Sequence, residues 1–147
     1  MTRGFSVLVG VLVSTVASRA GATTYHVATT GDDARQSRVA REVLARAEMV
    51  ALTLPTLCEF AWVLSRGYKI PADEISAGFR QLIDAANVVV NRPAAEAGLA
   101  HLEAGGDFAD GVIAFEGASL GADTFVSFDK SAVRLALAQG LNTKLLA

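Results

Sequence analysis

Short apolar runs and helix-like segments alternate along this chain from Asp32 to its end. The apolar runs have the length and composition of buried strands, whereas the segments between them carry apolar residues at helical spacing. Two strands joined through a helix pair in parallel, because the helix carries the chain back to the edge where the first strand began. The pattern predicts an α/β fold with a mostly parallel central sheet flanked by helices on both faces. Strands are expected at residues 49–54, 88–90, 124–128 and 143–146.

Proline and glycine mark the expected helix boundaries. Proline is favoured in the first helical turn, where its missing N–H has no helical partner, and glycine is favoured just beyond the last turn. Pro55, Pro71 and Pro93 each stand at the start of a helical pattern, and Gly67 and Gly140 stand at helix ends. Helices are therefore expected at residues 32–48, 56–67, 71–86, 93–104, 107–117 and 131–138.

Composition excludes several classes of protein. The length of 147 residues favours one domain, and 52% hydrophobic residues are enough for a core. A single cysteine excludes an internal disulfide and a cysteine-rich zinc site. The net charge of −2 excludes a globally basic nucleic-acid binder, although a local basic patch remains compatible with it.

The first thirty residues differ from the rest in charge. Residues 1–31 hold two arginines and no acid, whereas all 15 acidic residues follow. Three interpretations fit: a signal peptide cleaved after Ala20, a buried strand within Phe5 to Val13, or a segment foreign to the domain through a wrong start codon or an altered reading frame. We therefore divide the chain into an atypical apolar segment, 1–30, and a domain, 31–147.

Glu59 is the most informative single residue. It lies in the apolar stretch TLCEFAWVLSRG, with no Lys or Arg three or four positions away to pair with it on a helix. Burying such a carboxylate costs free energy unless a metal ion, a distant arginine or water at the edge of a cleft compensates it. The alternative is that Glu59 lies on a narrow solvent-facing side of the helix.

Three aspartates form a second signal. Asp107 and Asp110 lie on one face of an expected first helical turn, where Asp107 also fits as N-cap with Asp110 at the third helical position. Asp129 directly follows an expected strand, at the end where α/β sheets bind ligands, although a turn-forming role also fits. Close carboxylates repel one another unless they are protonated or bridged by cations. Oxygen-only sites suit Mg²⁺ or Mn²⁺, and two such ions can activate water for phosphodiester cleavage.

The remaining polar residues give weaker signals. We expect His101 to be structural or on the surface, because it has no metal-ligand spacing to another histidine. We expect Cys58 to pack in the core, because it lies in an apolar run with no histidine nearby in the sequence, and Trp62 to pack there as well. Six bases are candidates to flank a phosphate backbone, although scattered bases usually form solvated surface. They are Arg66, Lys69, Arg80, Arg92, Lys130 and Arg134.

Four stretches together resemble a known family. They are GDDARQSRVAREVL, LPTLCEFAWVLSRGY, GGDFADGVIAFEGASLGADTFVSFDK and LNTKLL. In order and spacing they are similar to PIN-domain proteins, most of all the VapC-type toxins of bacterial toxin–antitoxin pairs, over about residues 31–147. The resemblance implies a single PIN-like domain and a cytoplasmic, Mg²⁺- or Mn²⁺-dependent endoribonuclease. It also implies an RNA substrate, a cognate antitoxin that neutralises the enzyme, a homodimer and no membrane association.

The resemblance also assigns roles to individual residues. Glu59, Asp110 and Asp129 match the catalytic, metal-binding acids, and Ser127 matches the supporting hydroxyl residue before the last of them. Asp107 matches an often-acidic position and is a further candidate metal ligand.

One part of the family pattern is missing. The family begins with a short strand that ends in Asp-Thr-Asn, whose Asp is a principal metal ligand. That motif would fall near residues 21–23, yet residues 1–31 contain no Asp, Glu or Asn. The rival hypothesis is therefore a catalytically impaired PIN-fold protein that still binds an antitoxin. A third is an exported protein, if the opening segment acts as a signal.

Overall fold

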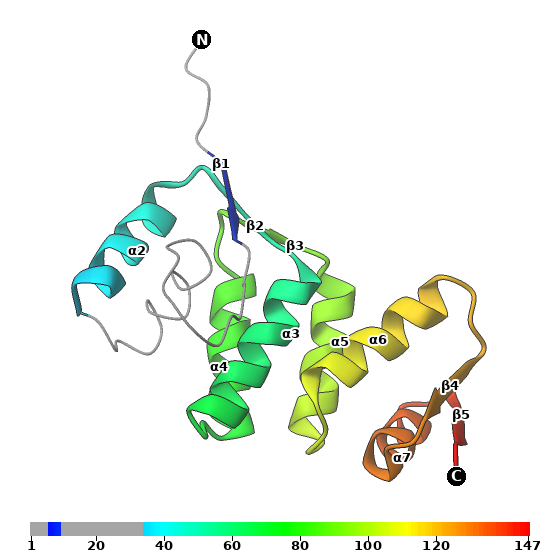
Figure 1. Cartoon of the computed structure of the whole chain (residues 1–147). Coiled ribbons are helices and arrows are strands. Elements are labelled where there is room, and N and C mark those ends of the chain that lie inside the picture. Colours follow the sequence, from blue (N-terminus) through cyan, green and yellow to red (C-terminus); the bar gives the residue numbers. More distant parts are fainter. Residues whose placement is uncertain (1–5, 10–33) are drawn as a thin grey trace.

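Strands and helices alternate through the chain, as expected (Figure 1). The computed structural model describes residues 6–9 and 34–147. In chain order the elements are β1 (Ser6–Val9), α2 (Ala34–Arg46), β2 (Met49–Leu52), α3 (Leu54–Trp62), the π-helical turn η1 (Val63–Gly67), α4 (Ala72–Ile83), β3 (Val88–Val90), α5 (Arg92–Glu103), α6 (Phe108–Ser119), β4 (Thr124–Ser127), α7 (Lys130–Ala138) and β5 (Asn142–Leu145).

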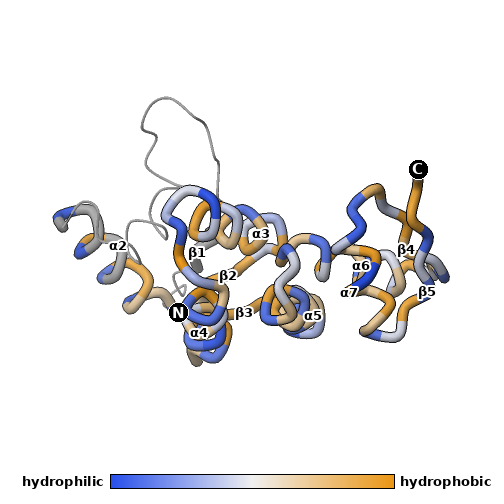
Figure 2. The backbone as a smooth tube through the Cα atoms, turned by 90° about the horizontal axis from the view of Figure 1, so that it is seen from below, coloured by the Kyte–Doolittle hydropathy of each residue, from blue (hydrophilic) through white to orange (hydrophobic). Residues whose placement is uncertain are grey.

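All described strands pair in parallel, which confirms the α/β class. β2 lies between β1 and β3, with Val50 opposite Val7 on one side and Val88 on the other. β4 pairs with β5, with Thr124 opposite Asn142. In the described ranges the strands thus form a three-stranded and a two-stranded sheet instead of one continuous sheet. Figure 2 shows α2 and the β4–β5 sheet at opposite ends of the molecule, with α3 to α6 between them.

The core is built where α3, α4, α5 and α6 meet below the three-stranded sheet. The rings of Phe60 and Phe79 stack at 5.2 Å between centroids, and Phe79 meets Phe108 edge to face at 5.3 Å. Leu57 and Leu99 are fully buried beside them. Such aromatic contacts add to the free energy gained by burying the rings, so these three phenylalanines tie α3, α4 and α6 together.

Two glycines allow α5 and α6 to pack closely. A Cβ added at Gly98 would lie 2.7 Å from Cε2 of Phe108, and one added at Gly111 would lie 2.5 Å from the carbonyl oxygen of Ala97. Real Cβ atoms do not approach other atoms so closely, and protein interiors leave no slack to relieve the overlap. The position of α6 against α5, and with it the position of Asp110, therefore depends on both glycines.

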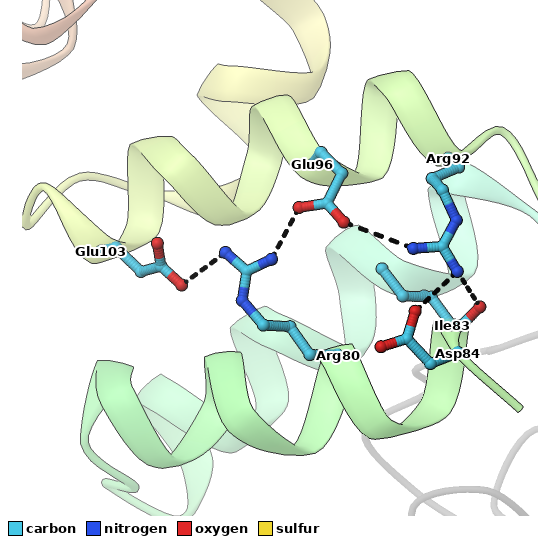
Figure 3. A network of polar contacts seen from close by, with 6 residues as sticks. All are labelled: Arg80, Ile83, Asp84, Arg92, Glu96 and Glu103. Carbon is cyan, nitrogen blue, oxygen red and sulfur yellow. Dashed lines mark hydrogen bonds and ion pairs between the residues drawn. The ribbon is translucent and has the colours of Figure 1, made fainter.

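Ion pairs join α4 to α5 on the outer side of the molecule (Figure 3). Arg80 contacts Glu96 at 2.7 Å and Glu103 at 2.9 Å, and Arg92 contacts Asp84 at 2.7 Å. All five side chains are substantially exposed, so solvent screens each pair and the contribution to stability is small. Their importance lies in engaging two of the six candidate phosphate-binding bases, Arg80 and Arg92.

Several expected boundaries need correction. The expected helix at 56–67 ends as α3 at Trp62 and continues as the π-helical turn η1, and Trp62 is 50% exposed and not in the core. The strand at 124–128 stops at Ser127, leaving Phe128 exposed. By contrast, the strand at 88–90 is confirmed to the residue.

Some expectations concern the amino-terminal segment. β1 falls inside the strand expected within Phe5 to Val13. The first two residues of the helix expected at 32–48, the cleavage site proposed after Ala20 and the place of the missing Asp-Thr-Asn motif at 21–23 lie outside the described residues. Within residues 6–9 and 34–147, no helix has both the length and the apolar character needed to cross a membrane.

Candidate active site

A cavity of about 470 Å³ opens beside the amino-terminal ends of α6 and α7. Residues of η1 and of the loop that follows it also line this cavity. Seven polar residues line it: Ser65, Arg66, Lys69, Asp107, Asp110, Asp129 and Ser131. Three of the five candidate site residues, all of them aspartates, therefore share one cavity although they come from two helices.

Asp107 and Asp110 are held by the first turn of α6. Asp107 is the N-cap, and its Oδ1 accepts a hydrogen bond of 2.9 Å from the backbone N–H of Ala109. This confirms the capping interpretation of Asp107, with Asp110 at the third helical position. Burial, and then the negative charge of Asp107, raise the pKa of the Asp110 carboxyl above its ordinary value; His101 opposes that shift and Asp129 adds to it. The charged form of Asp110 is therefore destabilised by its two carboxylate neighbours.

Asp129 enters the cavity from the other helix. It is the N-cap of α7, and its Oδ1 accepts hydrogen bonds from the backbone N–H groups of Ser131 at 2.6 Å and Ala132 at 3.2 Å. The N–H of Asp129 in turn donates to Oγ of Ser127 at 3.0 Å. Ser127, at the end of β4, thus holds the backbone of the turn that carries Asp129; its supporting role in a site stays a prediction.

Glu59 does not join the three aspartates. It is half-buried on α3 and is not among the residues that line the cavity. Ala61 and Ser65 of the same helical segment do line it. Successive helical residues are about 100° apart around the axis, so Glu59 lies on a different side of the helix from Ala61. Its role as a catalytic metal ligand stays a prediction.

The cavity has the donors that a hard divalent cation prefers. Among residues 6–9 and 34–147, no three Asp, Glu, His or Cys side chains are grouped closely enough to hold an ion together. Mg²⁺ commonly retains several waters and binds through one or two carboxylates. Asp110, whose pKa is raised by burial and by the nearby charge of Asp107, lines a cavity with room for bound water, so an ion of this largely hydrated kind would fit between Asp110 and one neighbouring aspartate.

Two further residues matter near the cavity: His101, for which the structural alternative is correct, and Gly106, to which the sequence assigned no role. His101 is fully buried, its Nδ1 lies 3.3 Å from Oε1 of Gln139 on α7, and its Nε2 has no hydrogen-bond partner. A Cβ at Gly106, which lines the cavity, would collide with the His101 ring and lie 2.6 Å from Cδ1 of Leu135. No short motif marks Gly106, because its constraint arises from α5 and α7 together.

Cys58 is not an activated nucleophile. Burial, and then the charge of Asp107, raise the pKa of its thiol to about 11. The reactive form of a cysteine is the thiolate, which is scarce far below the pKa. This supports the expectation that Cys58 contributes packing and not chemistry.

Comparison with known protein families matches residues 23–137 to the PIN domain. Comparisons with curated proteins and with solved structures find no match. The match covers α2 to α7 and so includes every residue of the cavity.

Proposed function

This chain belongs to the PIN-domain family, whose members are typically metal-dependent nucleases, and from that premise we propose that it is an endoribonuclease and the toxin of a toxin–antitoxin pair. The observation that carries the proposal is the single cavity that Asp107, Asp110 and Asp129 all line. We further propose that Mg²⁺ or Mn²⁺ is the cofactor, that the chain works in the cytoplasm as a homodimer, and that a small antitoxin protein is its partner.

A bound divalent cation supplies the Lewis acidity that phosphodiester hydrolysis requires. In this proposal the carboxylate of Asp110 holds the cation, assisted by the free oxygen of Asp107 or Asp129. The capping hydrogen bonds of Asp107 and Asp129 fix where those oxygens lie, so little reorganisation is needed when the ion binds. Ser127 holds the backbone of Asp129 and is a positioning residue. Glu59, which does not line the cavity, remains a proposed ligand on the family resemblance alone.

The test is cleavage of a labelled RNA by the purified chain with Mg²⁺, with Mn²⁺ and with EDTA. Asparagine is the informative replacement for Asp110 and Asp129, because at Asp129 it keeps the N-cap while it removes the charge. Each variant should lose activity by about a hundredfold or more, since even indirect partners of a metal ligand cost about 10- to 100-fold. Glu116→Gln is the matched control, because Glu116 lies exposed on α6 away from the cavity. Cleavage that persists undiminished in EDTA would refute the proposal.

A second candidate is a catalytically impaired PIN-fold protein that still binds an antitoxin. It is favoured by the lack of any Asp, Glu or Asn in residues 1–31 and by the position of Glu59 outside the cavity. Fewer carboxylates bind a cation more weakly. Co-purification with a small antitoxin, together with RNA left intact at every metal concentration, would select this function over the first.

A further inference from the structure

The cavity is lined by side chains of both charges. Asp107, Asp110 and Asp129 come from the starts of α6 and α7, whereas Arg66 and Lys69 come from η1 and the loop after it. Both bases are exposed, and neither forms an ion pair with a carboxylate anywhere in the described ranges. Arg80 and Arg92 differ, because their guanidinium groups are occupied by the α4–α5 ion pairs (Figure 3). Arg66 and Lys69 are therefore free to bind an anion.

The backbone around Lys69 is held in an unusual conformation. The N–H of Tyr68 donates to the carbonyl of Val63 at 3.1 Å, and the N–H of Ile70 donates to the carbonyl of Leu64 at 3.0 Å. Between these bonds Lys69 has φ of 59°, in the left-handed region that favours glycine. Helices often end with glycine at such a position. A lysine here adds a cation at the cavity rim at the cost of a less favourable backbone conformation.

A polyanionic substrate meets an electrostatic obstacle at this cavity. Three carboxylates repel a phosphodiester, and a metal ion at Asp110 offsets that repulsion only where it sits. Phosphate groups on either side of the reacting one need cations of their own, and Arg and Lys are the side chains that supply them. A cavity of about 470 Å³ is comparable with sites that enclose small molecules, so it suits a flexible strand more than a rigid duplex.

We infer that Arg66 and Lys69 form a phosphate-binding subsite for single-stranded RNA in the cavity that the carboxylates also line. The inference rests on the proposed nuclease function, since it identifies what holds the substrate of that site. Arg66 and Lys69 bind the backbone phosphates that flank the scissile one and carry no base specificity. Their contribution is electrostatic, so it weakens as salt is added.

The test measures binding of a fluorescently labelled single-stranded RNA in EDTA, by anisotropy over a range of salt concentrations. For single strands each phosphate contact contributes a slope of about −0.7 in log affinity against log salt, which is about fivefold in affinity near 0.1 M salt. Arg66→Gln and Lys69→Gly should each weaken binding by about fivefold and reduce the slope by about 0.7, and the double variant by about 25-fold. Arg66→Lys, which retains the charge, should restore most of the affinity.

Two variants separate the loss of a phosphate contact from other causes of weaker binding. Lys69→Gly controls for loss of folding, and Lys144→Gln controls for the loss of one positive charge elsewhere on the protein. Glycine accepts φ of 59° more readily than lysine, so Lys69→Gly should remain folded and at least as stable as the parent chain. Lys144→Gln removes the same charge from exposed β5, away from the cavity, and should leave affinity and slope unchanged.

The two proposals fail in different ways. Equal affinity and equal salt slope in Arg66→Gln, Lys69→Gly and the parent chain would overturn the subsite, even if metal-dependent cleavage is observed. A parent chain that shows no RNA binding overturns it as well. Absence of cleavage with every metal, while the variants still weaken binding, would refute the nuclease function and leave the subsite supported.

Discussion

Replacing Gly111 with alanine should destabilise the protein and displace the part of α6 that carries Asp110. The new Cβ would lie 2.5 Å from the carbonyl oxygen of Ala97 and 2.9 Å from Cα of Gly98, both backbone atoms of α5. Backbone atoms move only with their helix, so the overlap cannot be relieved by a side-chain rotation. Overpacking of this kind costs about 1–3 kcal/mol, and the backbone contacts place Gly111→Ala near the upper end.

Helix propensity opposes that cost only in part. Alanine is favoured over glycine by about 1 kcal/mol inside a helix, so the expected net loss for Gly111→Ala is about 2 kcal/mol. For a chain of this size that corresponds to a fall in Tm of about 4–8 °C. Urea unfolding followed by circular dichroism would measure the change, with an unchanged m-value as the sign that two-state unfolding is retained.

Gly117→Ala in the same helix is the matched control. A Cβ at Gly117 would meet no atom within 4 Å, so only the propensity gain applies and stability should rise by about 0.5–1 kcal/mol. RNA cleavage should fall in Gly111→Ala, because Asp110 is its neighbour, and be retained in Gly117→Ala. If Gly111→Ala proves as stable as Gly117→Ala, the close packing of α5 and α6 is not the reason for the glycine.

Three other predictions concern Asp129, Asp110 and Cys58. Asp129→Ala should lower the free energy of unfolding by about 1 kcal/mol through loss of the N-cap of α7, whereas Asp129→Asn should change it little; urea unfolding of both variants distinguishes the cap from the charge. The raised pKa of Asp110 means that the folded state binds its proton more tightly than the unfolded chain, so this group's stabilising contribution is lost as pH rises. In EDTA, the free energy of unfolding of Asp110→Asn minus that of the parent chain should therefore increase as the pH is raised from below 3.8 to neutral. A difference that stays constant over this pH range would contradict the pKa shift. Cys58, with a thiol pKa of about 11, should alkylate slowly in the folded state at neutral pH and rapidly in urea, and Cys58→Ala should retain full RNA cleavage.

Local chemistry explains why much of the fold was predictable. The strand at Val88–Val90 is an uninterrupted β-branched run, and its bounds match the expectation. Asp107 and Asp129 cap helices because their oxygens reach N–H groups two or three residues further along the chain. Interactions of this range depend on neighbouring residues alone, so the order of residues is enough to anticipate them.

Contacts between segments that are distant in the sequence decide which bases are paired and which residues line the cavity, and the pattern of residues could not predict these. Six scattered bases look alike in the sequence, yet Arg80 is paired with Glu96 and Glu103 on another helix, while Arg66 and Lys69 line the same cavity as the three aspartates. Glu59 is a proposed ligand beside Asp110 and Asp129, yet it is Ala61 at the end of α3 and Ser65 in η1 that line the cavity. The rotation of a helix about its own axis is set by the whole apolar face that must be buried, not by one polar residue.

The same division holds for the two helices that carry the site. Cap residues predict where α6 and α7 start. How closely the neighbouring elements pack depends on glycines: Gly98 and Gly111 allow α6 to lie against α5, and Gly106 makes room for the buried ring of His101. A glycine that is needed for close approach looks the same in a sequence as one that is merely tolerated. Which of them are required emerges only when the chain has folded, because the atoms they would collide with come from other helices.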